Sequence, residues 1–198
     1  MTLPPAPPGQ IILLNGASSA GKSTLCRALQ SALPEPFLYF ALDLLLFSGV
    51  VPRRPEPAGA FAWAEQRPRL FAGYHRCLAA MAGVGNNLVA DYVLEEQASL
   101  DDLKRVLSPY DVFFVGVHCP LPELERRERA RGDRRIGDAR SDFARVHTFG
   151  GYDLEVDSTL APEVNAAQIV TAWQTRTRPG IFESAGPHPE ASEDQASW

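Results

Sequence analysis

The chain has 198 residues, enough for one α/β domain with its own core but small for two. Its residues are 45% hydrophobic and 22% charged, with a net charge of −5 at pH 7, so the composition gives no reason to expect nucleic acid or an anionic membrane as a partner. No apolar stretch approaches the roughly 18 to 20 residues of a membrane span, and the N-terminus lacks the pattern of a signal peptide.

Residues 1–9 contain four prolines and predict a loose arm. From residue 10 to residue 175, short apolar runs alternate with helical patterns, which predicts one α/β domain with parallel strands and right-handed crossovers. The predicted strands span residues 10–15, 36–42, 86–93, 111–119 and 152–158. The predicted helices span residues 21–32, 61–83, 95–107, 121–131, 136–147 and 162–176. Residues 176–198 are polar and rich in Pro, Gly and Ser, and we expect a mobile tail there.

One stretch departs from this alternation. Residues 48–69 contain prolines at positions 52, 55, 57 and 68, which disfavour a regular element. We expect this stretch to pass over the surface before the long helix that follows.

The segment GASSAGKST fits the pattern G-x-x-x-x-G-K-[ST] directly after the first predicted strand. Its glycines let backbone N–H groups approach phosphate oxygens, and the following helix adds partial positive charge. Lys22 can reach the β- and γ-phosphates, and the Ser23 hydroxyl can ligate Mg²⁺. A plain glycine turn is the less favoured alternative. We expect ATP or GTP to be bound by Gly16, Ala17, Ser18, Ser19, Ala20, Gly21, Lys22, Ser23 and Thr24.

Two single carboxylates each end an apolar run that is predicted to be a strand. Because the C-terminal ends of parallel strands lie at one edge of a sheet, Asp43 and Asp91 should lie beside the phosphate loop. Asp43 is the candidate catalytic or substrate-orienting group, with a helix N-cap as the alternative. Asp91 is a candidate for a Mg²⁺ or substrate contact, with a turn residue as the alternative. Asp111 starts a strand and should lie at the opposite edge.

The segment ERRERARGDRR contains six arginines within residues 126–135. On a helix, Arg127 and Arg131 lie one turn apart on one face, and Arg134 follows the break at Gly132. The pattern predicts a lid over residues 125–140 whose arginines close on the nucleotide and neutralise charge on the transferred phosphoryl group. A solvated helix with internal Glu–Arg pairs is the alternative. No aromatic residues interleave with the arginines, which disfavours a nucleic-acid patch.

Two weaker signals concern aromatic and histidine residues. Aromatic side chains around Trp63 could line an apolar acceptor pocket, although at helical spacing such residues more often belong to the core. The four histidines do not stand at metal-ligand spacing, and we expect each to be structural. Trp63 is therefore a candidate substrate contact, and we expect no histidine metal site.

The sequence resembles the chloramphenicol phosphotransferase family of small P-loop kinases. The resemblance covers residues 11–160, in the segments IILLNGASSAGKST, LQSALPEPFLYFALDLLL, VFFVGVHC, RERARGDR and VHTFGGYDLEVDST. It implies a P-loop kinase-like three-layer sandwich with a five-stranded parallel sheet and helices on both sides.

The resemblance also implies roles for individual residues. It makes Asp43 the general base on the acceptor hydroxyl, and it assigns Arg131 and Arg134 to the lid. Lys22 and Ser23 would serve ATP and Mg²⁺. Asp91 falls at a position where the family often has two acids, but here Tyr92 takes the second place. Residues 48–69 depart most from the family, and acceptor recognition should largely lie there.

We therefore predict an ATP- and Mg²⁺-dependent phosphotransferase acting on a hydroxyl of a small molecule, with chloramphenicol or a related natural product as the leading acceptor and antibiotic inactivation as the result. A kinase for a nucleoside, a sugar or another metabolite is one alternative, and a non-catalytic nucleotide-sensing regulator is another. We expect neither nucleic acid nor a membrane as partner, and we leave a homo-oligomer open. Three widely spaced cysteines suit buried thiols in a reducing compartment, so we expect a cytoplasmic protein.

Overall fold

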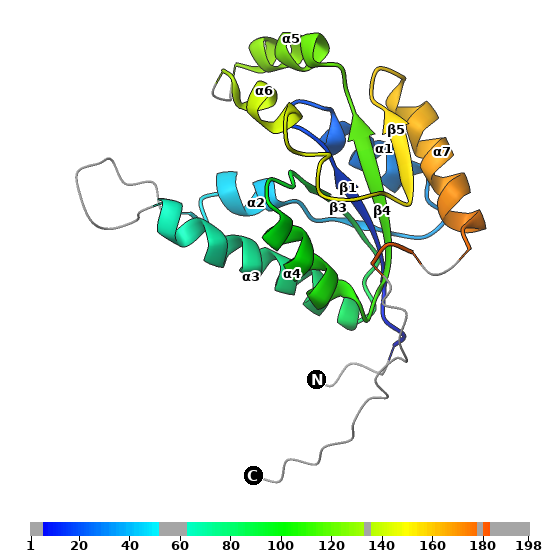
Figure 1. Cartoon of the computed structure of the whole chain (residues 1–198). Helices are drawn as coiled ribbons and strands as arrows, with labels where there is room; N and C mark the ends of the chain where they lie inside the picture. Colours follow the sequence, from blue (N-terminus) through cyan, green and yellow to red (C-terminus); the bar gives the residue numbers. More distant parts are fainter. Residues whose placement is uncertain (1–5, 52–62, 133–135, 178–179, 183–198) are drawn as a thin grey trace.

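The computed structural model describes residues 6–51, 63–132, 136–177 and 180–182. Its centre is a five-stranded parallel sheet in the order β2-β3-β1-β4-β5 (Figure 1). The strands are β1 (Gln10–Asn15), β2 (Leu38–Tyr39), β3 (Leu88–Tyr92), β4 (Asp111–His118) and β5 (Leu154–Asp157). The predicted five-stranded parallel sheet is confirmed.

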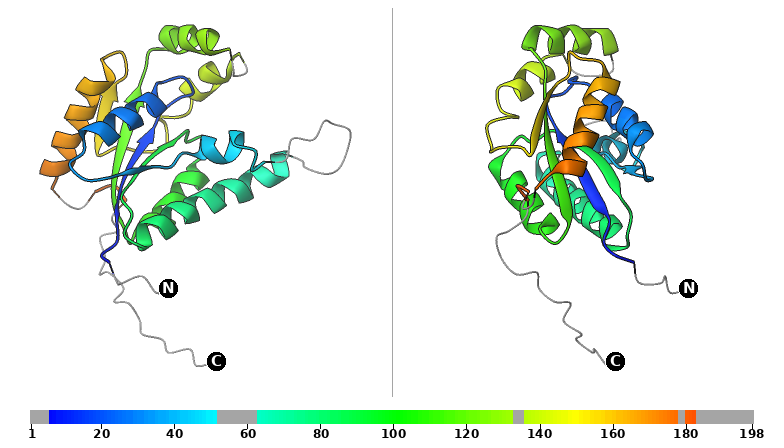
Figure 2. Two further views of the ribbon diagram at one scale, coloured as in Figure 1. Left: turned by 180° about the vertical axis from the view of Figure 1, so that it is seen from behind. Right: turned by 90° about the vertical axis from the view of Figure 1, so that its right-hand side faces the viewer.

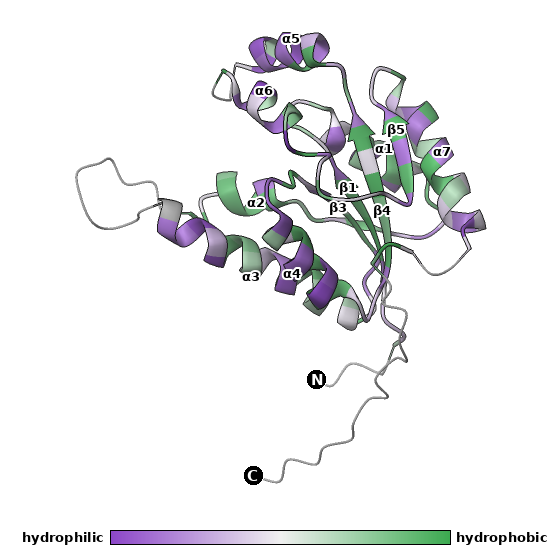
Figure 3. Cartoon of the chain, in the orientation of Figure 1, coloured by the Kyte–Doolittle hydropathy of each residue, from purple (hydrophilic) through white to green (hydrophobic). Residues whose placement is uncertain are grey.

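Helices cover both faces of this sheet (Figure 2). They are α1 (Lys22–Ala32), α2 (Leu42–Phe47), α3 (Trp63–Gly83), α4 (Gln97–Leu107), α5 (Leu121–Arg131), α6 (Asp138–Phe143) and α7 (Pro162–Thr175). Successive side chains of a strand point to opposite faces. In β1, Ile12 and Leu14 therefore pack in the core beneath α1 and α7, whereas Ile11 and Leu13 pack against α3 and α4. Coloured by hydropathy, α5 is largely hydrophilic, in contrast to the apolar strand β3 (Figure 3).

The second strand is shorter than the sequence predicts. Residues 36–42 were predicted to be one strand, but only Leu38 and Tyr39 pair with β3. β2 lies at the edge of the sheet with a single partner, so its pairing ends where the chain diverges from β3. Leu42 then buries its side chain in the core on the α3 side and begins α2.

This difference changes the local setting of Asp43. Asp43 lies in the first turn of α2 and does not end a strand. The N-cap of that helix is Ala41, so the alternative that made Asp43 an N-cap is wrong. In the predicted excursion over residues 48–69, residues 52–62 lie outside the described residues, α3 begins at Trp63, and Pro68 lies inside that helix.

The packed part of the chain runs past residue 175, where the sequence predicts the end of the domain. The Ile181 N–H donates to Oδ1 of Asp153 at 3.0 Å. Phe182 is 2% exposed, and its ring centroid lies 5.2 Å from that of Phe114 in β4. The first five residues and residues 183–198 of the predicted arm and tail lie outside the described residues.

Within the described ranges, no helix combines the length and the apolar character that crossing a membrane requires.

Candidate active site

The backbone of the loop between β1 and α1 needs small residues, because it has positive φ angles and passes close to β4. Ser19 and Gly21 have left-handed φ values of 64° and 91°. Glycine adopts this region without strain. A Cβ atom at Gly16 would lie 2.5 Å from the carbonyl oxygen of Val117 in β4. The two glycines of the motif thus let the loop turn tightly against the end of the sheet.

Lys22 begins α1, and its side chain folds back over the loop. Its Nζ donates to the carbonyl oxygens of Gly16 at 2.8 Å and Ala17 at 2.9 Å. Burial lowers the pKa of Lys22, while the negative charges of Asp91 and Asp43 act in the opposite direction. The lysine therefore lies within electrostatic reach of both carboxylates that the sequence analysis singled out.

The loop also has hydrogen-bond donors, a backbone N–H and a hydroxyl group, that can bind anionic oxygens. The Ser18 N–H donates to Oδ2 of Asp142 in α6 at 3.0 Å, so a carboxylate oxygen already lies against one loop amide. Burial raises the pKa of Asp142. The Ser19 hydroxyl is buried and, among the described residues, has no hydrogen-bond partner. These donors, together with the Lys22 ammonium, fit the phosphate groups of a nucleotide.

Asp91 lies near the end of β3, next to the first turn of α1. Its Oδ2 accepts the hydroxyl of Ser23 at 3.0 Å and that of Tyr39 at 3.0 Å. Burial raises the pKa of Tyr39, and the charge of Asp91 adds to that rise, so the phenol stays protonated and donates. Carboxylate and hydroxyl oxygens are the ligand types that Mg²⁺ takes. The structure thus brings together Ser23 and Asp91, the two residues predicted as metal ligands.

One cleft of about 1470 Å³ joins the phosphate loop to α2 and α3. The predicted site residues that line it are Ser18, Ser19, Ala20, Gly21, Lys22, Ser23, Thr24, Asp43, Asp91, Arg127 and Arg131. Asp43 contributes from α2, and Leu42 and Leu46 add apolar surface beside it. Arg134 and the side chain of Trp63 lie outside the described residues, so their predicted roles stay predictions.

The arginine-rich helix α5 meets the phosphate loop through Arg127. This side chain donates to the carbonyl oxygens of Ala20 at 3.2 Å and Ser158 at 2.8 Å, and to Glu123 at 2.7 Å. Arg127 therefore links the helix to the loop and to the residue that follows β5. Arg131 is exposed at the end of α5, where it lines the cleft.

Several residues of the site were missed by sequence reasoning, and most of them are charged. Asn15 is fully buried at the end of β1, where Nδ2 donates to the carbonyl oxygen of Val146 at 2.9 Å and Oδ1 accepts the N–H of Leu94 at 2.8 Å. A polar residue that ends an apolar run directly before the loop was the signal for it. Glu95 and Arg145 line the cleft from segments that are far apart in the sequence.

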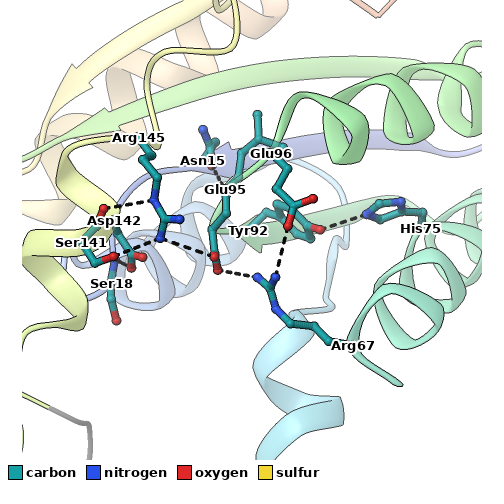
Figure 4. A network of polar contacts seen from close by, with 11 residues as sticks. Asn15, Ser18, Arg67, His75, Tyr92, Glu95, Glu96, Ser141, Asp142 and Arg145 are labelled. Atoms are coloured by element: carbon teal, nitrogen blue, oxygen red, sulfur yellow. Dashed lines mark hydrogen bonds and ion pairs between the residues drawn. The ribbon is translucent and has the colours of Figure 1, made fainter. Parts of the chain in front are cut away.

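A chain of charged side chains crosses the cleft (Figure 4). Glu95, after β3, lies 2.6 Å from Nη2 of Arg67 in α3 and 3.7 Å from Nη2 of Arg145. Arg67 also lies 3.4 Å from Glu96 and places its guanidinium 4.4 Å from the ring centroid of Phe71. The acidic pair at positions 95 and 96, directly after a predicted strand, was the only sign of this arrangement in the sequence.

Tyr92 takes the second acidic position of the family pattern, and its side chain packs against residues of α3. Its ring stacks on that of Tyr74, and its hydroxyl lies 3.1 Å from Nε2 of His75. Nδ1 of His75 lies 2.7 Å from Asp102. Burial lowers the pKa of His75, although Asp102 acts in the opposite direction. Tyr92 therefore joins β3 to α3 and does not serve as a second acid.

Two other histidines, distant in the sequence, lie face to face. The ring centroids of His118 and His147 are 3.9 Å apart, and Nδ1 of His147 lies 2.8 Å from the hydroxyl of Tyr152. Their spacing in the sequence does not predict this contact. Over the described ranges, no three or more His, Cys, Asp or Glu side chains group in a way that could hold a metal ion.

The sheet order and the phosphate loop together define a fold, that of the P-loop kinases. The APS kinase CysC of Mycobacterium tuberculosis, in complex with AMPPNP and APS, superposes with a TM-score of 0.66 at 16% identity, over 86% of this chain and 100% of that one. Shikimate kinase from Aquifex aeolicus gives a TM-score of 0.53 at 15% identity, over 83% of this chain and 96% of that one. At these identities the likeness shows the fold alone.

Sequence comparison gives the family. The chloramphenicol phosphotransferase-like family model matches residues 9–174, so the chain belongs to that family. It is 34% identical over 175 residues to a Mycobacterium tuberculosis protein described as "Putative O-phosphotransferase Rv2636", with 79% of this chain and 78% of that protein covered. Family and fold together support a phosphotransferase, and the resemblance noted in the sequence is confirmed.

Proposed function

We propose that this protein uses ATP and Mg²⁺ to phosphorylate a hydroxyl of a small molecule, with chloramphenicol or a related natural product as the leading acceptor. One observation carries the proposal: Lys22 of the phosphate loop and Asp43 of α2 line the same cleft and interact electrostatically. One cleft thus has a place for ATP, the phosphoryl donor, and a carboxylate base for the hydroxyl of the acceptor.

The roles follow from the chemistry of phosphoryl transfer. The loop amides and Lys22 hold the β- and γ-phosphates, and Ser23 and Asp91 provide oxygen ligands for Mg²⁺, which neutralises phosphate charge when bound. The acceptor hydroxyl loses its proton to Asp43 while its oxygen bonds to the γ-phosphorus, and the bond to the bridging oxygen of ADP breaks. Arg131 and Arg134, as lid arginines, stabilise charge on the transferred group.

A direct assay tests this proposal. Purified protein is incubated with ATP and Mg²⁺, with and without chloramphenicol, and ADP release and the mass of the acceptor are followed. We expect chloramphenicol-dependent ADP release and an acceptor heavier by one phosphoryl group. Asp101→Asn, which alters an exposed carboxylate of α4 outside the cleft, is the control variant and should match the unmodified protein.

The polar residues of the cleft support a second candidate function, phosphorylation of a nucleoside or a sugar. Arg67, Glu95 and Glu96 offer hydrogen-bonding groups to a polyhydroxylated acceptor such as a nucleoside or a sugar. A panel of such hydroxyl compounds under the same assay separates this candidate from a chloramphenicol kinase. If no hydroxyl compound is phosphorylated, and ATP instead changes association with a protein partner, a nucleotide-sensing regulator replaces both.

A further inference from the structure

Charge is unevenly distributed along the cleft. Near the phosphate loop, α5 and α6, the charged lining residues are the cations Lys22, Arg126, Arg127 and Arg131 and the acids Asp91, Asp138 and Asp142. The half of the cleft between α2, α3 and residues 93–96, here called the acceptor half, carries the carboxylates Asp43, Glu95 and Glu96. The described cations that line this half are Arg67 and, from beyond α6, Arg145. Among the residues that the structure describes, cations therefore outnumber carboxylates near the phosphate loop, whereas carboxylates outnumber guanidinium groups in the acceptor half.

Both arginines of the acceptor half are held by one carboxylate. Glu95 contacts Arg67 at 2.6 Å and Arg145 at 3.7 Å, so it lies between them (Figure 4). Its side chain is 28% exposed and that of Arg67 is 23% exposed, so water screens the pair only partly. An anionic group on an acceptor would have to compete with Glu95 for these guanidinium groups while lying close to its negative charge.

The other wall of the acceptor half is apolar. Leu42 and Leu46 of α2 and Phe71 of α3 line it, and the Arg67 guanidinium lies over the Phe71 ring. The surface offers contact to an apolar or aromatic body and hydrogen bonds to neutral polar groups. The two described guanidinium groups of this half, those of Arg67 and Arg145, are both in ion pairs with Glu95.

From this arrangement we infer that Glu95 is a specificity-determining residue that excludes anionic acceptors, so that the substrate is an uncharged hydroxyl compound with an apolar body. The inference rests on the proposed function, because it names the substrate class of that same site. Specificity of this kind arises from repulsion against the wrong ligand as much as from attraction to the right one.

Matched pairs of acceptors test this inference. One pair is chloramphenicol and the analogue in which an oxalyl group, which ends in a carboxylate, replaces the dichloroacetyl group on its nitrogen. The second pair is N-benzoylserinamide and N-benzoylserine. For each pair, the ratio of kcat/KM for the uncharged member to that for the anionic member measures discrimination. We expect the unmodified protein to favour the uncharged members by a factor on the order of 10 or more.

Two variants separate charge exclusion from simple loss of the ion pair. Glu95→Gln removes the repelling charge and should lower the discrimination ratio about tenfold. Arg67→Gln breaks the same ion pair but removes a positive charge, so its ratio should stay the same or rise. A merely structural role of the pair would make the two variants behave alike. Glu65→Gln, an identical change at an exposed position of α3 outside the cleft, should leave the ratio unchanged.

The outcomes distinguish this inference from the proposed function. If no hydroxyl compound is phosphorylated, the proposed function fails, and discrimination is then measured as the ratio of dissociation constants of the same pairs by calorimetry with Mg²⁺ and a non-hydrolysable ATP analogue. The inference is overturned if the unmodified protein accepts or binds the anionic members equally well, if neither member of a pair binds, or if Glu95→Gln leaves the ratio unchanged.

Discussion

Individual carboxylates in the cleft have different surroundings, and this separates their roles. Asp91 is 6% exposed, and its Oδ2 accepts two hydroxyl donors beside the phosphate loop, so its position suits a cation ligand. Asp142 accepts a loop amide. Asp43 is half-buried in the first turn of α2 and lines the cleft, and it is the carboxylate that we propose as the base.

The assignment of Asp43 leads to a first prediction. Asp43→Asn keeps the size and polarity of the side chain but removes its ability to take a proton. We expect phosphoryl transfer to fall by a factor on the order of 10² or more, as for loss of a positioned base. Nucleotide affinity, measured by calorimetry, should change little. Near-normal turnover in this variant would remove Asp43 from the role of base.

A second prediction concerns His147 and acid stability. Burial, aided by the charge of His118, lowers the pKa of His147 from 6.5 to about 4. As the pH falls from about 6.5 towards 4, the unfolded chain binds a proton at this residue and the folded protein does not, so the folded state loses stability. His147→Gln cannot titrate, and its free energy of unfolding should fall less steeply between about pH 7 and about pH 4.5.

Urea unfolding at several pH values measures these slopes. Absolute stability of the variant does not matter here, because losing the contact with Tyr152 affects every pH alike. Equal slopes in the two proteins would mean that His147 titrates normally in the folded state.

At the scale of elements, the segment from α5 to α6 is organised by an acid within the arginine run. Glu128 is 2% exposed and accepts the backbone N–H groups of Gly137 at 2.9 Å and Ala139 at 2.8 Å. The bond from Gly137 chiefly lowers the pKa of Glu128, so the carboxylate is ionised and caps the start of α6. Because α6 carries Asp142, Glu128 also sets where that carboxylate meets the phosphate loop.

This contact gives a third prediction. Glu128→Ala leaves two amides at the start of α6 without their acceptor and should lower the free energy of unfolding by roughly 2 to 4 kcal/mol. The KM for ATP should rise as α6 loosens from the loop. Glu125→Ala, which removes an exposed ion pair with Arg140, should cost less than about 1 kcal/mol. Equal losses in denaturant unfolding would argue against the capping role of Glu128.

Element boundaries were predictable where local signals were strong. β1 and α5 begin and end where the sequence predicts, because a glycine loop or prolines bound their patterns. The run PFLYFALDLLLF was not divided correctly, because a continuous apolar stretch fits a buried strand and a buried helix equally well. The strand ends where its pairing with β3 ends, and β3 is the single neighbour of β2 in the sheet.

At the scale of the whole molecule, the chain returns to the sheet after its last helix. Phe182 packs on Phe114 within the core that also contains α3 and α4. The Asp153 carboxylate accepts the N–H groups of both Phe114 and Ile181, which holds this return beside β4 and β5. The core on this face of the sheet is therefore completed by residues that the sequence predicted as part of a tail.

The fourth prediction tests this closing contact. Phe182→Ala removes a buried aromatic ring and should lower the free energy of unfolding by about 3 kcal/mol or more. Val164→Ala, at a position of α7 that is 54% exposed, should change it by less than about 0.5 kcal/mol. Thermal or denaturant unfolding measures both. A loss for Phe182→Ala no larger than for Val164→Ala would mean that residues 180–182 contribute little to the core.

Local patterns were sufficient for the phosphate loop, the alternation of strands and helices, and the family. A glycine spacing or an apolar period is written within a few neighbouring residues, and backbone sterics and burial translate it directly into structure. Contacts between distant segments could not be obtained in this way. The placement of Glu95 between Arg67 and Arg145, the stacking of His118 on His147 and the capping of α6 by Glu128 arise only when the packed sheet brings these segments together.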